Sequence, residues 1–171
     1  MNELSTLGRR TGELLKVRGD TVSVAESSAG GIISAALLAL PGASAYFRGG
    51  LVTYTRESRQ AFLQHPTDPF ADVAPSSEAF ARTLARSMRE RLATTWAIGE
   101  TGAAGPTGNR YGYDAGHACI AVAGPIELSA LIETRTGNRE LNMWSFASAA
   151  LELLHKAMEQ AGGAAAGTLR T

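Results

Sequence analysis

TVSVAESSAGG, residues 21–31, is the most informative segment of the chain. Its first five residues, Thr21–Ala25, are a short β-branched run that predicts a buried strand. A turn of small residues follows, Glu26–Gly31, and then an apolar helix, Ile32–Leu40, that ends before Pro41-Gly42. This order of strand, turn and helix brings the start of a helix beside the carboxyl end of a strand, which is a common place for a ligand site.

The rest of the chain alternates strands with helices until a late hairpin. The sequence predicts further strands over 47–54 and 96–99, a hairpin of 118–123 with 126–133, and helices over 4–19, 55–63, 78–92 and 138–160. This alternation indicates an α/β fold, a three-layer α/β/α sandwich on a mixed β-sheet. We expect one domain over residues 1–171, with a Gly/Ala tail at about 161–171 that frays.

The charge balance argues against two classes of partner. Lys plus Arg equals Asp plus Glu at 16 each, and a neutral chain has no electrostatic footprint for nucleic acid or an anionic membrane. The longest apolar stretch, Ile32–Leu40, is too short for a bilayer, which needs about 20 residues. Met1–Arg10 lacks the apolar core of a signal peptide, and a single cysteine, Cys119, fits a reducing compartment. We therefore expect a soluble cytoplasmic protein.

Metal and triphosphate chemistry find little support in the sequence. The histidines, His65, His117 and His155, are scattered along the chain. The loop Thr101–Gly108 lacks the Gly-Lys-Thr with which a Walker sequence holds a triphosphate. We expect no metal site and no bound cofactor.

Three polar, glycine-rich segments predict a binding pocket: Glu26–Gly31, Gly49–Arg59 and Glu100–Gly116. Each should meet the carboxyl-terminal edge of the sheet, where open α/β sheets bind ligands. The walls of the expected pocket are Ser27, Tyr54, Arg59, Thr101–Gly105 and His117. From the residues alone, a simple helix cap is the favoured interpretation of Ser27 or Ser28, ahead of an active site.

Five motifs, in order, resemble the CinA C-terminal domain family, whose members include nicotinamide-nucleotide amidohydrolases. The family's Glu-Ser-Cys-Thr-Gly-Gly turn is Glu26–Gly31 here, and its Pro-Gly-Ser-Ser with the following Gly-Gly-Val-Val-Thr-Tyr-Ser strand corresponds to Pro41–Thr55. Its Val-Ser-Glu helix start is matched by Ser76–Glu78, its Thr-Gly-Ile-Ala-Gly-Pro loop by Thr101–Pro106, and its Gly-Asp-Arg by Gly137–Arg139. The match runs from Leu14 to about Leu154.

The resemblance implies a reaction and a set of roles. Such domains hydrolyse the carboxamide of nicotinamide mononucleotide to nicotinate mononucleotide and ammonia, with a serine nucleophile, here Ser27, and a lysine base. The candidate catalytic residues are Ser27, Tyr54, Arg59 and His117. The candidate substrate-binding residues are Glu26, Ser28, Gly30, Gly31, Glu100, Thr101, Gly102, Ala103 and Gly105.

Arg59 stands where the family has its lysine. A guanidinium is effectively never deprotonated, so it cannot act as the general base, although it could clamp a phosphate or lower the pKa of the serine. We therefore expect a weakened or lost amidohydrolase. The alternative is a catalytically silent module that still binds a nucleotide.

Further differences from the family fall near the same place. Ser28 replaces a cysteine, Ala29 replaces a threonine, and His117 replaces another threonine. His117 is either a substitute base or a hydrogen-bonded residue at the start of a strand. Glu100 could orient His117, bind a ribose or remain a solvated charge. Met143-Trp144 replaces an arginine pair, and these apolar side chains belong either to the core or to a dimer interface. Together with the analogy to the family, the pair predicts a homodimer or larger assembly.

Overall fold

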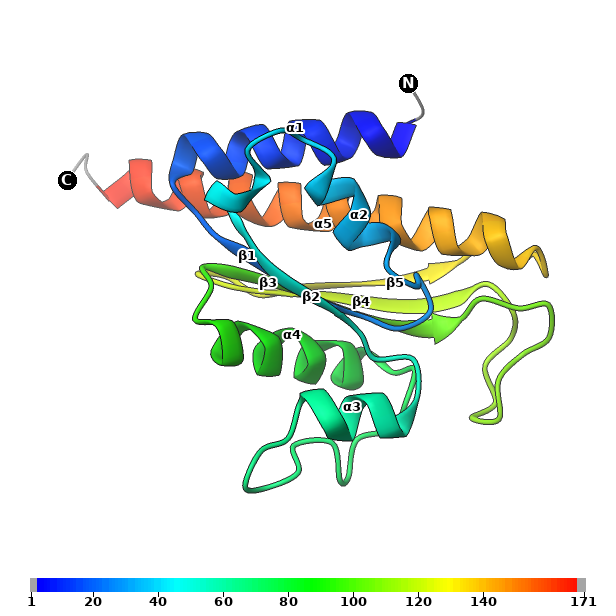
Figure 1. Ribbon diagram of the computed structural model, residues 1–171. Helices are drawn as coiled ribbons and strands as arrows, with labels where there is room; N and C mark the ends of the chain where they lie inside the picture. Colours follow the sequence, from blue (N-terminus) through cyan, green and yellow to red (C-terminus); the bar gives the residue numbers. More distant parts are fainter. Residues whose placement is uncertain (1–2, 169–171) are drawn as a thin grey trace.

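Five strands form one mixed sheet in the order β2-β1-β3-β4-β5. The protein is described by a computed structural model that covers the backbone of residues 3–168 and the side chains of residues 3–162 (Figure 1). Strand β1 (Val22–Glu26) lies parallel to β2 (Phe47–Val52) and to β3 (Trp96–Ala103). Strands β4 (His117–Ala123) and β5 (Leu128–Glu133) continue the sheet in antiparallel pairs. The predicted mixed sheet is thereby confirmed.

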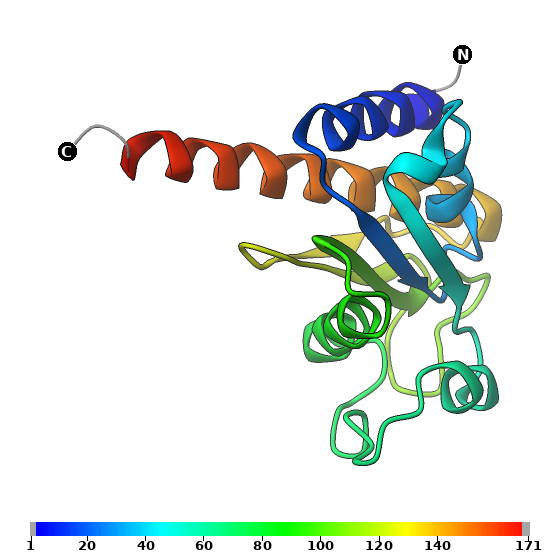
Figure 2. The same ribbon diagram turned by 60° about the vertical axis from the view of Figure 1, so that its left-hand side comes forward.

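Helices cover both faces of this sheet (Figures 1 and 2). On one face lie α2 (Ile32–Leu38) and α5 (Arg139–Thr168), and α1 (Glu3–Arg18) packs against both of them. On the other face lies α4 (Glu78–Leu92), with the short α3 (Arg56–Phe62) beyond it. A single 3-10 turn, Ala43–Ala45, leads into β2. None of the helices in the described residues is long and apolar enough to cross a membrane.

The core is built from the apolar strands at the centre of the sheet. Every residue of β1 and of β4 is buried, as expected for inner strands covered on both faces. Trp96, at the start of β3, is fully buried, and its indole N–H donates to a carboxylate oxygen of Asp20 at 2.9 Å. A buried polar tip with a partner avoids the cost of an unsatisfied donor.

Helix α4 lies unusually close to β3 at Gly99. A Cβ atom built at Gly99 would lie 2.1 Å from the carbonyl oxygen of Ala81 and 2.6 Å from the amide nitrogen of Ala85. Only glycine lets the helix backbone approach the strand this closely.

Several predicted boundaries shift by one or two residues, and two are wrong by more. Strand β3 continues to Ala103 instead of ending at Gly99, because it pairs with β4 as far as the Ala103–His117 partners. Thr101, Gly102 and Ala103 are therefore strand residues, and the loop begins after them. Helix α5 continues to Thr168 rather than ending near Gln160. The last part of the tail that was expected to fray, 169–171, lies outside the described residues.

Candidate functional site

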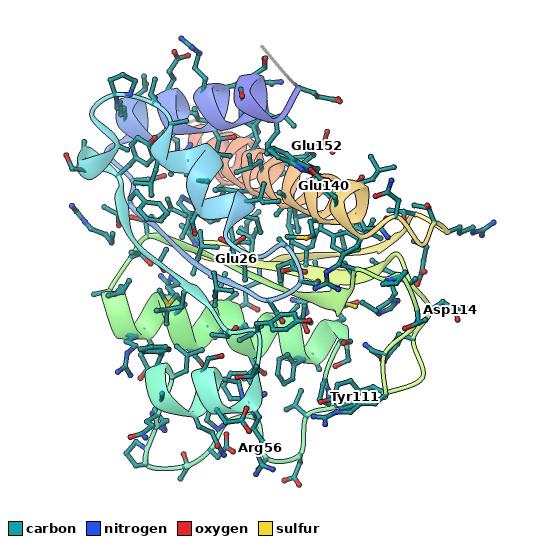
Figure 3. The ribbon with its side chains drawn as sticks, turned by 45° about the vertical axis from the view of Figure 1, so that its right-hand side comes forward. Glu26, Arg56, Tyr111, Asp114, Glu140 and Glu152 are labelled. Carbon is teal, nitrogen blue, oxygen red and sulfur yellow. The ribbon has the colours of Figure 1, made fainter. Side chains whose placement is uncertain are left out.

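A polar cleft of about 570 Å³ opens where β1, β2 and β3 end. Its walls come from the turn after β1, the start of α3 with the residues before it, the segment that leads into α4 with the first turn of that helix, and the end of β3 with the loop that follows. Arg56 and Tyr111, which both line this cleft, are labelled in Figure 3. The predicted residues that line it are Ser27, Tyr54, Arg59, Thr101 and Gly102. Ala103, Gly105 and His117 do not.

Ser27 follows β1 directly and is only partly buried. The carboxylate of Glu100 holds its turn, because one oxygen accepts from the amides of Ser27 and Ala29, both at 2.9 Å. The other oxygen accepts from the hydroxyl of Ser28. Glu100, expected to bind a ribose, to orient His117 or to be solvated, is instead fully buried and fixes the backbone that carries Ser27.

Burial raises the pKa of Glu100 to about 7, and the neighbouring charge of Glu26 acts in the same direction. The three hydrogen bonds from the turn act in the opposite direction and hold the pKa below the value that burial alone would give.

Glu26 has a similar structural role at the start of α2, the next segment of the chain. Its carboxylate accepts from the amides of Ile33 and Ser34, each at 3.0 Å, and from the Ser34 hydroxyl at 2.7 Å. Glu26 is fully buried and does not line the cleft, so it is the cap of α2 rather than a ligand contact. The start of α2, where the sequence indicated a place for a ligand, is therefore already bound to a carboxylate of the protein.

Gly30 and Gly31 make the turn possible. Their φ angles are +68° and +101°, a left-handed conformation that side chains disfavour. A Cβ atom on Gly30 would also lie 2.7 Å from the terminal methyl group of Met143. These glycines shape the backbone between β1 and α2, and Ser28 is buried beneath it.

Arg59 projects from α3, which Thr55 caps by accepting from the Ser58 amide. The guanidinium lies over two aromatic rings, 4.7 Å from the centre of Phe70 and 5.1 Å from that of Phe80. Stacking of this kind fixes the plane of the group and leaves its N–H edge free to bind an anion.

Two more arginines that the sequence analysis did not single out, Arg56 and Arg110, line the same cleft. Both lie near Glu57, whose pKa is lowered first by a hydrogen bond to its own backbone, then by the Thr55 side chain, and further by these two charges. Within the described part of the chain, neither they nor Arg59 forms a salt bridge. The cleft therefore contains three guanidinium groups and one carboxylate.

Tyr54 stands at the rim and is 59% exposed. Its hydroxyl accepts from Arg139 at 3.2 Å, and the same guanidinium donates to the carbonyl of Gly105 at 2.7 Å. Arg139 was quoted within a family motif but not as a site residue. Its signal was the motif itself. Arg56 and Arg110 lie within the glycine-rich segments Gly49–Arg59 and Glu100–Gly116, which were the signal that could have pointed to them.

His117, expected to be either a substitute base or a hydrogen-bonded residue at a strand start, has the second role. It is 5% exposed, and its two ring nitrogens lie 2.6 Å from Glu133 and 2.9 Å from the Ser76 carbonyl oxygen. With both nitrogens engaged and the ring outside the cleft, it is not placed to take a proton from Ser27.

Of the Met143-Trp144 pair, Met143 packs on the core and Trp144 is 39% exposed.

The described residues include no group of His, Cys, Asp and Glu that could hold a metal ion.

The comparisons with known proteins agree on one family. The family model described as CinA C-terminal domain matches residues 4–158. A CinA-like protein of Gloeobacter violaceus is 39% identical over 139 residues, which are 81% of this chain and 32% of that protein. One from Chloroherpeton thalassium is 36% identical over 154 residues, 88% of this chain and 37% of that protein. The chain thus spans about a third of the length of these relatives.

Solved structures share the fold over nearly the whole chain. The competence/damage inducible protein CihA from Agrobacterium tumefaciens has a TM-score of 0.83 and 27% identity, covering 93% of this chain and 97% of that one. The CinA superfamily protein KP700603 from Klebsiella pneumoniae has a TM-score of 0.84 and 26% identity, covering 93% and 99%.

Proposed function

The chain belongs to the CinA C-terminal domain family, and on that premise we propose that its cleft binds a phosphate-bearing nucleotide of the nicotinamide mononucleotide type. We propose further that it deamidates this ligand slowly or not at all. The observation that carries both statements is the make-up of the cleft, where, among the residues that the structure describes, Ser27 is accompanied by three arginines and by no lysine or histidine.

Binding follows from charge and geometry. Three guanidinium groups against one carboxylate leave an excess of two positive charges in the cleft, which matches a phosphate monoester at neutral pH. Arginine donates in a planar fork that fits phosphate oxygens bidentately. Arg59 is held in place by Phe70 and Phe80 before any ligand arrives, so little side-chain entropy is lost on binding.

Slow turnover follows from the lack of a base and of free donors. A serine nucleophile needs a neighbouring group that can take its proton, and arginine cannot do so. The one carboxylate of the cleft, Glu57, has a lowered pKa and is a correspondingly weak base. The amides of Ser27 and Ala29 already donate to Glu100, so they are not free to stabilise an oxyanion.

The binding test compares the natural protein with Arg59→Met by titration calorimetry with nicotinamide mononucleotide. Loss of one charge-assisted contact to phosphate should weaken binding by about tenfold or more. Arg48→Met is the matched control, because Arg48 lies on β2 outside the cleft and donates to the carbonyl of Ser44. Equal affinities for all three proteins, or no binding by the natural protein, would contradict the proposal.

The activity test measures ammonia release. The natural protein should release little or none, and Arg59→Lys should release more, provided the lysine is desolvated enough to lose its proton near neutral pH. Adding Ser27→Ala to Arg59→Lys should abolish the gain. No ammonia from either protein would favour the silent binding module. Robust release by the natural protein that survives Ser27→Ala would exclude Ser27 as the nucleophile.

A further inference from the structure

The loop after β3 contains a tight turn that presents Arg110 and Tyr111 to the cleft. The amide of Gly112 donates to the carbonyl of Asn109 at 3.2 Å, and the amide of Asn109 donates to the carbonyl of Tyr113 at 2.9 Å. Gly112 closes this turn with a φ angle of +89°, which residues other than glycine rarely adopt. Arg110 and Tyr111 are the two central residues of the turn, and both line the cleft.

The side chain of Asn109 fixes the turn in place. Its Oδ1 accepts from the amides of Tyr111 at 3.0 Å and Tyr113 at 3.3 Å. Its Nδ2 donates to the hydroxyl of Ser76 at 2.9 Å, which ties the turn to the segment before α4. The ring of Tyr113 stacks on that of His117, with 4.1 Å between the ring centres, and ties the turn to β4. Tyr111 is therefore carried by a backbone that is anchored at two places.

The ring of Tyr111 is 45% exposed and lines the cleft. Its hydroxyl accepts from the guanidinium of Arg110 at 2.8 Å, and the guanidinium carbon lies 5.1 Å from the ring centre. Among the residues that the structure describes, no other ring or cation stacks on it. The polar end of Tyr111 thus has a partner within the protein, while its ring offers a flat apolar surface to a ligand.

A planar aromatic ring is the ligand group that matches this surface. Stacking of a base on an aromatic side chain strengthens binding by about tenfold. Tyrosine has few rotatable bonds, and the anchored turn and the bond to Arg110 restrict it further, so little side-chain entropy is lost on binding. A sugar phosphate has no such ring. It can use the arginines of the cleft but gains nothing from Tyr111.

We propose that Tyr111 is a specificity-determining residue of the cleft: its ring stacks on the base of the bound nucleotide, and Arg110 holds the tyrosine in position for this contact. Because every base has a flat π-face, the contact selects nucleotides over sugar phosphates without selecting one base. The inference rests on the proposed function, since it needs a nucleotide in this cleft, but it concerns the base rather than the phosphate or deamidation.

Titration calorimetry of the full chain with three probes tests this role: nicotinamide mononucleotide, adenosine monophosphate and ribose 5-phosphate. The natural protein should bind the nucleotides about tenfold more tightly than ribose 5-phosphate. Tyr111→Leu should weaken binding of both nucleotides by about tenfold and leave the affinity for ribose 5-phosphate unchanged. Tyr111→Phe keeps the ring and should recover most of the affinity that Tyr111→Leu loses.

Two controls separate the ring contact from damage to the loop. Phe62→Leu is the matched variant and should change none of the three affinities, because Phe62 is an exposed aromatic residue of α3 that does not line the cleft. The amide of Gly112, which bonds to the carbonyl of Asn109, should exchange its hydrogen equally fast in Tyr111→Leu and in the natural protein. Faster exchange in the variant would assign the loss of affinity to the turn and would count against the proposal.

The outcomes also distinguish this inference from the proposed function. Equal weakening of all three probes by Tyr111→Leu, unchanged nucleotide affinities, or a natural protein that does not prefer nucleotides to ribose 5-phosphate would overturn the role of Tyr111. Tyr111-dependent binding of adenosine monophosphate without binding of nicotinamide mononucleotide would refute the proposed function alone. Binding of nicotinamide mononucleotide that ignores Tyr111→Leu would refute this inference alone.

Discussion

Glu100→Gln should make the protein more stable at alkaline pH. Glu100 is fully buried, and burial raises its pKa from 4.5 to about 7. Glutamine fits the same place, because its carbonyl oxygen can accept from the amides of Ser27 and Ala29 while its amide group donates to the Ser28 hydroxyl. It cannot ionise, so the variant removes the cost of a buried negative charge and keeps the hydrogen bonds.

The sign of the effect follows from proton binding. Between pH 4.5 and about 7 the folded chain holds a proton on Glu100 that the unfolded chain has released. The free energy of unfolding therefore falls as pH rises through this window, and the full loss is present above it. A difference of roughly two and a half pH units corresponds to about 3 kcal/mol. The advantage of Glu100→Gln over the natural protein should grow by about that amount from about pH 4 to about pH 8.

Urea unfolding followed by the fluorescence of Trp96 and Trp144 measures this difference at each pH. Glu127→Gln is the control, because hydrogen bonding to Arg86 lowers the pKa of Glu127. Glu127 therefore contributes stability above its ordinary pKa that is lost as pH falls, so the control should show a small effect of opposite sign. A stability difference between Glu100→Gln and the natural protein that is the same at both ends of the pH range would refute the reasoning.

Three further outcomes are expected. Cys119 is buried with a pKa of about 11, so a thiol reagent at about pH 8 should label it only after unfolding, and fast labelling of the native protein would contradict its burial. Gly99→Ala should lower the free energy of unfolding by about 1–3 kcal/mol, because the new methyl group meets the Ala81 carbonyl; an unchanged urea midpoint would show that α4 can shift. We also predict a homodimer or larger assembly through exposed Trp144, to be measured by light scattering at micromolar concentration, where Trp144→Ser should be monomeric; a monomeric natural protein would end this prediction.

Local patterns predicted most of the fold. Thr21–Ala25 has the β-branched composition of a buried strand, seen as β1, and the small residues after it leave room for a tight turn into α2. The three glycine-rich segments also predicted that Ser27, Tyr54 and Arg59 would line one cleft, and they do. These features depend on neighbours in the sequence and on the general geometry of α/β sheets.

What could not be predicted depends on pairing between distant strands. Gly102 and the glycines after it indicated a loop, but pairing with β4 extends β3 to Ala103. Glu100 and Thr101 are adjacent, yet side chains alternate across a strand, so Thr101 reaches the cleft while Glu100 turns to the Ser28 hydroxyl. The direction of each side chain follows from the register of the sheet, which one sequence does not reveal.

The arrangement of α1 and α5 has a practical consequence. Both helices lie across the sheet from α3 and α4, whose residues contribute to the cleft (Figure 1). The first residue of α5, Arg139, reaches the rim of the cleft at Tyr54, whereas the described residues of α1 and of the later turns of α5 do not line it. A carrier protein, a fluorescent reporter or a solid support joined through α1 or the later turns of α5 would therefore sit behind the sheet. The mouth of the cleft would stay open to solvent, so immobilised protein could be screened against nucleotide libraries without blocking the surface under test.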